Sequence, residues 1–194
     1  YFFPIKSNIE NKFATFTDFI IAIDHDLDNR SNRVPELYSS FEDIGSPLAS
    51  MRLLPPLSDK NKIICVGINY PKLYDDELTE KPEQIILFSK FYETIVGNRE
   101  PLLLPTGKAQ NSLDYEGEVA VVIGRAGFGI SKEGAKKHVL GLTLFNDGSV
   151  REWQKHSIEA GKNFYRSGAC GPYIVTRDEF TSSNEINFKT KLNG

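Results

Sequence analysis

The chain has 194 residues, with 23 Lys and Arg against 26 Asp and Glu and a formal net charge of −3. Because a surface that binds nucleic-acid phosphates usually shows a basic excess, this balance argues against a nucleic-acid partner. Hydrophobic residues make up 40% of the chain and charged residues 25%, which is ordinary for a folded domain. The longest apolar stretches are far too short to cross a bilayer, so we expect no contact with a membrane.

Cysteine usage limits the kind of site and the compartment. Cys65 and Cys170 are the only two cysteines, which excludes a disulfide framework and a zinc site built from several thiolates. We expect a reducing compartment, the cytoplasm, with the mitochondrion as an open alternative. No basic and then apolar leader pattern follows Tyr1, so we expect any targeting peptide to be absent or removed.

The sequence predicts two domains. A stretch rich in Pro and Gly at residues 45–61 is typical of a boundary. We therefore expect a small N-terminal domain over residues 1–60 and a second domain over residues 61–194.

Short apolar runs and turn residues predict the elements of the second domain in chain order. Ile63–Gly67 is a continuous apolar run, typical of a strand buried on both faces. The further expected elements are strands at 85–88, 101–104 and 115–123, a helix over 132–139, a strand at 142–145, a turn at 146–148, a helix over 149–156 and a strand at 172–176. Many short strands with two modest helices indicate an α+β, mostly β architecture.

Two acidic residues lie close together in the clearest strand. Glu116 and Glu118 project to the same face, because side chains alternate along a strand, and their carboxylates are close enough to share a cation. A strand end that emerges into solvent explains the pair equally simply. The residues alone leave both readings open.

A second polar group follows the strand at 142–145. If the segment after Asp147 is helical, then Asp147, Arg151 and Gln154 lie on one helix face and converge on one site. The simpler alternative makes Asp147 a helix cap and Arg151 a surface charge. Lys162 lies in a glycine-flanked loop, where it is either exposed or places a positive charge on a substrate carboxylate or enolate.

Four ordered motifs resemble the fumarylacetoacetate hydrolase family over about residues 50–194. They are KIICVGINY at 62–70, YEGEVAVVIG at 115–124, NDGSVREWQ at 146–154, and GKNF at 161–164 followed by GPYIVT at 171–176. The resemblance implies a mixed β-roll fold, a bound Mg²⁺, Mn²⁺ or Ca²⁺, and a homodimer. It also implies a small β-diketo or 2-oxo acid substrate, which such enzymes hydrolyse, decarboxylate, hydrate or isomerise.

The resemblance also assigns roles to residues. It implies that Glu116, Glu118 and Asp147 are metal ligands, a set of hard oxygen donors that suits a hard cation. It implies that Arg151, Gln154 and Lys162 hold the substrate's oxygens, with Lys162 also acting in catalysis beside the enolate. From this we expect hydrolysis of a C–C bond through a metal-stabilised enolate.

The chain departs from the family pattern in two places. Where many members carry a water-activating His and Glu, this chain has Leu73 and Asp76. Leucine transfers no proton, so Asp76 acts as a base alone or belongs to an exposed acidic loop. Family members also continue beyond the segment that ends at Gly194, so we expect a truncated domain. These departures favour, as alternatives, a decarboxylase, an isomerase or a non-catalytic relative.

Overall fold

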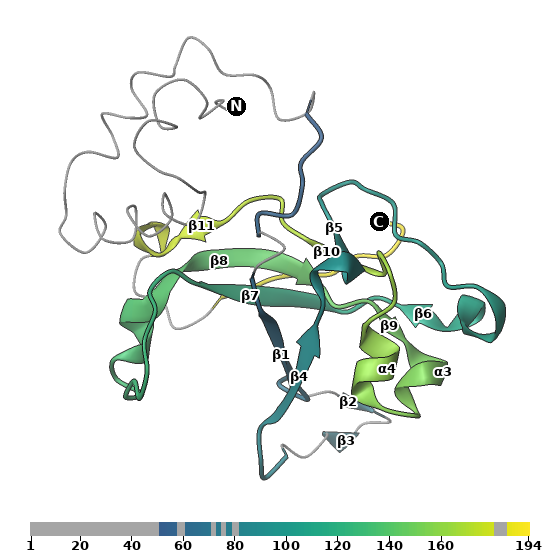
Figure 1. The fold of residues 1–194 in the computed structure, drawn as a ribbon, viewed down its shortest axis with the longest axis horizontal. Helices are drawn as coiled ribbons and strands as arrows, with labels where there is room; N and C mark the ends of the chain where they lie inside the picture. The colour runs from purple at the N-terminus through teal and green to yellow at the C-terminus, as the bar shows by residue number, and fades with distance from the viewer. Residues whose placement is uncertain (1–50, 58–60, 71–72, 75–76, 79–81, 181–185) are drawn as a thin grey trace. The chain divides into compact units, whose positions relative to one another are not determined.

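The computed structural model describes residues 51–194 apart from 58–60, 71–72, 75–76, 79–81 and 181–185 (Figure 1). The predicted N-terminal domain at 1–60 lies mostly outside the described residues and stays a prediction. The chain separates into two compact units. One consists of Leu54–Glu118 and Leu144–Pro172, and the other of Tyr1–Leu53, Val119–Thr143 and Tyr173–Gly194.

The described elements are mostly short strands, as predicted. They are β1 Ile63–Gly67, β2 Leu73–Tyr74, β3 Glu77–Leu78, β4 Ile86–Lys90, β5 Ile95–Val96, β6 Leu113–Asp114, β7 Gly117–Ile123, β8 Val139–Asn146, β9 Ser149–Val150, α3 Arg151–Gln154, α4 Ile158–Lys162, β10 Gly168–Cys170 and β11 Val175–Thr176. Single 3₁₀ turns cover Tyr92–Thr94, Gly107–Ser112, Ala135–His138 and Arg177–Glu179. The expected α+β, mostly β class is confirmed.

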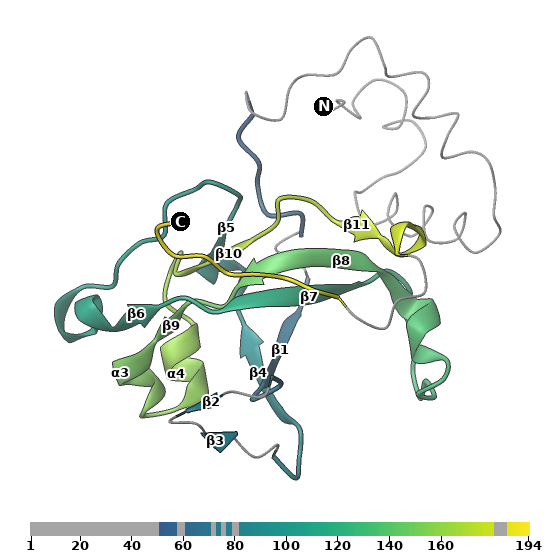
Figure 2. The same ribbon diagram turned by 180° about the vertical axis from the view of Figure 1, so that it is seen from behind.

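The longest strand, β8, organises the largest sheet. Its strand order is β11-β8-β10-β5, and β7 pairs with β8 (Figure 2). β10 is antiparallel to β8, with Ala169 opposite Asn146, and parallel to β5. The end of β8, Leu144–Asn146, belongs to the same compact unit as β5 and β10, and Asp147 follows it directly.

The first strand differs from its prediction. β1 pairs antiparallel with β4 in a two-stranded ribbon, with Cys65 opposite Phe88. Phe88 is buried, but Ile64 and Val66 on the other face of β1 are 57% and 47% exposed. The expectation that this strand is buried on both faces is wrong for the described chain, because only one face of the ribbon is covered.

Two other predicted elements also differ. The segment 101–104 is not a strand, because Pro101 and Pro105 lack amide donors; Leu103 makes one backbone hydrogen bond, to the Arg166 carbonyl at 2.9 Å. The helix expected over 132–139 is only the 3₁₀ turn Ala135–His138. Gly134 lies inside that segment, and so short a helix is unstable without tertiary packing.

Helices α3 and α4 lie side by side and frame the candidate site (Figures 1 and 2). The predicted helix over 149–156 is confirmed only at Arg151–Gln154. Helix α4 was not predicted, although Ser157 is a helix cap whose Oγ accepts a hydrogen bond from the Ala160 amide at 3.0 Å. A Cβ on Gly161 would lie 2.6 Å from the Gln154 Cα, so this glycine permits the close approach of the two helices.

Candidate active site

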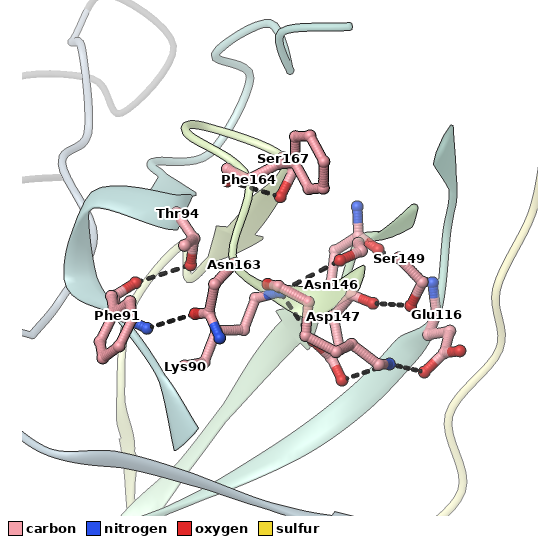
Figure 3. A network of polar contacts seen from close by, with 12 residues as sticks. Lys90, Phe91, Thr94, Glu116, Asn146, Asp147, Ser149, Asn163, Phe164 and Ser167 are labelled. Carbon is pink, nitrogen blue, oxygen red and sulfur yellow. Dashed lines mark hydrogen bonds and ion pairs between the residues drawn. The ribbon is translucent and has the colours of Figure 1, made fainter. Parts of the chain in front are cut away.

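The backbone places Glu116 and Asp147 next to each other. The Asp147 amide donates to the Glu116 carbonyl at 2.8 Å, and the Glu116 amide donates to Asn146 Oδ1 at 3.1 Å (Figure 3). Ser149 Oγ donates to the Asp147 carbonyl at 2.9 Å. These three bonds hold the backbone of Asp147, which follows β8, against that of Glu116, which precedes β7. The backbone therefore fixes the positions from which both carboxylates extend.

Gly148 is required by the tight backbone at this turn. A Cβ at this position would overlap the carbonyl of Ser167, which is itself fully buried. Any larger residue would have to separate the turn from the segment that precedes β10. The sequence predicted a turn at 146–148; in the structure Asn146 ends β8, and Asp147 and Gly148 form a short connection to β9 that is not a defined turn, in which the glycine has a packing role.

Lys162 lies between the two carboxylates. Its Nζ donates to Glu116 Oε2 at 2.6 Å and to Asp147 Oδ2 at 2.7 Å. The side chain is 3% exposed, and Nζ lies 5.3 Å from the centroid of the Phe88 ring. The end of α4 thus delivers a buried ammonium to the acidic pair, whereas an exposed loop lysine was the alternative from the sequence.

A second lysine, Lys90 at the end of β4, was not anticipated. Its Nζ donates to the carbonyls of Lys162 at 2.6 Å and Gly148 at 3.1 Å. It also forms an ion pair with Asp147 Oδ1 at 2.8 Å. The alternation of β4 carries a signal for it, because Lys90 follows Phe88 by two positions and shares its buried face.

Arg151 connects Glu116 to a further acid. Its Nε and Nη2 donate to Asp114 Oδ2 at 2.9 and 2.7 Å, and its Nη1 lies 2.5 Å from Glu116 Oε1. Nη1 also donates to Gln154 Oε1 at 3.0 Å. The predicted proximity of Arg151 and Gln154 is confirmed. Asp147 precedes α3 and does not lie on the same helix face, where the prediction placed it. It is connected to Arg151 through ion pairs with Lys162 and Glu116.

These contacts form one line of alternating charges, which we call the charge ladder. Its members, in spatial order, are Asp114, Arg151, Glu116, Lys162, Asp147 and Lys90. Three carboxylates and three cations sum to zero charge. Each interior member has an opposite charge on both sides, which compensates the cost of burying it.

Glu118 lies outside the charge ladder, and its ionisation differs from that of Glu116. Burial raises the pKa of Glu118; a hydrogen bond with Tyr70 opposes this, and the charges of Glu116 and Asp147 raise the pKa further. Burial also raises the pKa of Glu116, but the hydrogen bonds and charges of Lys162 and Arg151 lower it more, so its net shift is downward. The net shift of the Glu118 pKa is therefore upward, opposite to that of Glu116.

Both cysteines are poor nucleophiles. Burial raises the pKa of Cys65 to about 12, and the charge of Asp147 adds to the effect. Burial alone raises the pKa of Cys170 to about 12. A thiol with so high a pKa is almost entirely protonated at neutral pH. Cys170 is buried and packs as a small apolar side chain.

The three predicted metal ligands fit a hard cation in type but not in their present arrangement. Carboxylate oxygens are the donors that Mg²⁺ and Ca²⁺ prefer. Across the described ranges, however, no three His, Cys, Asp or Glu side chains are grouped so that they hold a metal ion. The Lys162 ammonium binds Glu116 and Asp147 instead.

The predicted base lies outside what the structure describes. Asp76 is one of the undescribed residues, so its predicted role is untested. The neighbouring Leu73 lies in β2, paired with Leu78 of β3.

Within the described part of the chain, no helix is long and apolar enough to cross a membrane.

Comparison with known proteins identifies the family. The family model described as "Fumarylacetoacetate (FAA) hydrolase C-terminal" matches residues 62–194. The chain belongs to the fumarylacetoacetate hydrolase family. The resemblance drawn from the four motifs is confirmed, and so is the mixed sheet architecture of this family, which similar solved structures share.

Individual relatives of this fumarylacetoacetate hydrolase family member carry different activities in their names. The mitochondrial oxaloacetate tautomerase fahd2 of Xenopus laevis is 34% identical over 150 residues, 75% of this chain and 46% of the relative. The 5-carboxymethyl-2-hydroxymuconate delta-isomerase of Mycobacterium smegmatis is 34% identical, with a TM-score of 0.57 over 68% of this chain and 52% of that structure. The fumarylacetoacetate hydrolase of Exiguobacterium antarcticum is 35% identical, with a TM-score of 0.58 over 72% and 51%. The chain thus spans about half the length of the curated relatives it matches.

Proposed function

We propose that this chain belongs to an enzyme that moves a proton within a small 2-oxo acid, as a tautomerase or isomerase. Oxaloacetate is the first candidate substrate. Two observations support this proposal over C–C hydrolysis. The names of the relatives include oxaloacetate tautomerase and two isomerases of unsaturated dioic acids. Leu73 stands where hydrolytic members carry the His that activates water, whereas tautomerisation consumes no water.

The observation that carries the proposal is the Lys162 ammonium, buried and held by two carboxylates. An ammonium has three N–H donors, of which two go to Glu116 and Asp147. The remaining N–H is available for the carbonyl oxygen of a 2-oxo acid. As a proton leaves the adjacent carbon, negative charge develops on that oxygen, and a fixed ammonium in a site of low dielectric stabilises it.

Arg151 and Gln154 complete the proposed substrate contacts. The guanidinium has five N–H donors, and Asp114, Glu116 and Gln154 fix its plane. These contacts use four of the five N–H groups, which leaves one N–H of Nη2, so a two-point contact with a substrate carboxylate requires one of these partners to be released. We propose that the guanidinium binds the substrate carboxylate, while Asp76 accepts the proton on the sequence evidence alone.

We also propose that Glu116, Glu118 and Asp147 bind Mg²⁺, or Mn²⁺ or Ca²⁺, when Lys162 gives up its contacts with them. The three donors are of the type that these cations prefer. The raised pKa of Glu118 supports the proposal, since an additional cation would relieve the repulsion among the three carboxylates. When bound, such a cation supplies Lewis-acid stabilisation of an enolate.

The test is a direct assay of oxaloacetate tautomerisation. The 194-residue chain is mixed with freshly dissolved enol oxaloacetate, with Mg²⁺ and with EDTA, and the loss of enol absorbance is followed. Lys162→Met should lose at least about a hundredfold in rate, an effect of the size expected for one electrostatic donor. The matched control is Lys155→Met, because Lys155 is largely exposed and pairs with Glu152 at the surface.

Product analysis separates the remaining alternatives. Pyruvate from oxaloacetate identifies a decarboxylase, and cleavage of an acylpyruvate identifies a C–C hydrolase. Turnover of neither compound, in a chain shown to be folded by circular dichroism, identifies a non-catalytic relative. A homodimer, which the family resemblance implies, stays a prediction that analytical ultracentrifugation of the same samples tests.

A further inference from the structure

Lys90 differs from Lys162 in the kind of acceptor that holds it. Lys90 Nζ donates to two backbone carbonyls, those of Lys162 and Gly148, and pairs with Asp147 Oδ1. Lys162 Nζ is held by two side-chain carboxylates, those of Glu116 and Asp147. A ligand can compete for side-chain carboxylates, but backbone carbonyls inside a packed turn stay where they are.

The surroundings of Lys90 fix it further. Its side chain is 0% exposed, and its strand is tied to the end of α4 by Asn163. The Asn163 side chain accepts from the Phe91 amide at 2.9 Å (Figure 3). It also donates to the Ser89 carbonyl at 3.0 Å. The residues on both sides of Lys90 are therefore bonded to the residue that follows Lys162.

From this we infer that Lys90 is a positioning residue, which holds Asp147 and the backbone of Lys162 in place while the Lys162 ammonium turns to the substrate. The ion pair between Lys90 Nζ and Oδ1 orients the Asp147 carboxylate. The 2.6 Å hydrogen bond from Lys90 Nζ fixes the backbone carbonyl of Lys162, whose ammonium is the proposed catalytic group. When Lys162 leaves Oδ2, Asp147 keeps an opposite charge. The buried carboxylate then stays ionised and in place.

This inference rests on the proposed function for the role of Lys162, and makes a claim about Lys90 that is measurable in the free protein. Lysine ammonium groups in buried ion pairs exchange their protons slowly enough to be seen by ¹H–¹⁵N NMR. We would label the 194-residue chain with ¹⁵N-lysine and assign the signals with Lys90→Met and Lys162→Met. In the free protein the Lys90 ammonium should show more restricted motion than that of Lys162.

Oxalate, a 2-oxo-acid mimic, then supplies the second readout. It should shift the Lys162 ammonium signal and leave the Lys90 signal in place. Equal mobility of the two ammonium groups in the free protein, or movement of both signals with oxalate, would overturn the inference. If oxalate and oxaloacetate neither bind nor react, the proposed function fails, and the mobility measurement still decides whether Lys90 is the fixed member of the pair.

Kinetics distinguish positioning from a purely structural role. Lys90→Met, assayed well below its unfolding temperature, should lower kcat for oxaloacetate at least about thirtyfold and change KM less than about threefold, because Lys90 touches no substrate. Lys155→Met serves again as the control. A folded Lys90→Met protein with wild-type kcat contradicts the inference. If the variant does not fold, the two NMR readouts on the wild-type chain decide the question.

Discussion

The Lys162 ammonium donates a 2.6 Å hydrogen bond to Glu116, although 46 positions separate the two residues in the sequence. The bond joins the end of α4 to the residue that precedes β7. Removing either partner would leave the other with one opposite charge instead of two, Glu116 with Arg151 or Lys162 with Asp147, so the cost should be less than the about 3–5 kcal/mol of a buried charge left wholly unpaired. The same contact therefore supports the fold and presents the ammonium to the site.

Arg151→Lys should weaken substrate binding more than it slows the chemical step. A lysine ammonium has three N–H donors in place of five, so it cannot keep the contacts with Asp114, Glu116 and Gln154 and also donate to a substrate carboxylate. Loss of one charged hydrogen bond costs about 1.5–3 kcal/mol, so KM for oxaloacetate should rise about tenfold to a hundredfold. Steady-state kinetics measure this, and Lys155→Arg, at an exposed lysine, is the control. A selective loss of kcat would contradict the substrate-binding role of Arg151.

Glu118→Gln should stabilise the protein at neutral pH in EDTA. The folded-state pKa of Glu118 is raised, so the folded chain binds more protons than the unfolded chain between the two pKa values. Stability therefore falls as pH rises through this window, and the ionised carboxylate is destabilising above it. The side chain is only half-buried, so solvent screening limits the gain to about 1 kcal/mol, or about 2–4 °C in Tm.

The pH dependence of that gain is the control for Glu118. Below about pH 4 the carboxyl is protonated in both folded and unfolded chains, and the variant and wild type should melt together. Thermal melts at a series of pH values measure the difference. A gain that persists undiminished at acidic pH would mean that packing, and not charge, causes it.

A divalent cation should raise the Tm of the wild-type chain, and Asp147→Asn should abolish the effect. At a hundred times its dissociation constant a ligand stabilises the folded state by about 2.7 kcal/mol. Melts with Mg²⁺ and Mn²⁺, with and without oxalate, test the proposed ligand set. Asp178→Asn, in a 3₁₀ turn outside the site, is the control. Equal cation responses from wild type and Asp147→Asn would exclude Asp147 as a ligand.

Gly148→Ala should destabilise the fold and disturb the site together. Its Cβ would overlap the Ser167 carbonyl, so the turn or the start of β10 has to move. Overpacking of this kind costs about 1–3 kcal/mol, occasionally more. Gly134→Ala is the matched control, since the nearest atom to its new Cβ is Ser131 Oγ at 3.4 Å. Circular dichroism melts and the tautomerase assay follow the two effects separately.

The sequence predicted the site better than it predicted helix boundaries. Alternation along a strand and spacing along a helix selected Glu116, Arg151 and Gln154 from local patterns, and the described structure places all three in contact with the charge ladder. Lys162 and Asp147 lie in the same network, but sequence spacing does not reveal that a lysine lies between two acids. Such pairing depends on which distant segments meet.

Lys90 shows most clearly what a local pattern leaves out. A lysine at the end of a strand normally extends into solvent, and its burial beside Phe88 depends on acceptors supplied by Gly148 and Lys162, far along the chain. The segment 101–104 is not a strand, and the reason is visible in the sequence, because prolines flank its leucines. Its leucines favour a strand, but the flanking prolines lack the amide donors that a strand ladder needs.

The net charge of the charge ladder is zero, and this affects how an anion approaches the site. Three cations alternate with three carboxylates over distances of 2.5–2.8 Å, so their fields cancel a short way into solvent. The charge ladder therefore adds little long-range steering of the proposed 2-oxo acid substrate, so any dependence of the capture rate on ionic strength should come from charges outside the ladder, such as Glu118. We expect the cations of the charge ladder to select the proposed substrate at short range, when one of them releases a protein carboxylate and binds a substrate carboxylate.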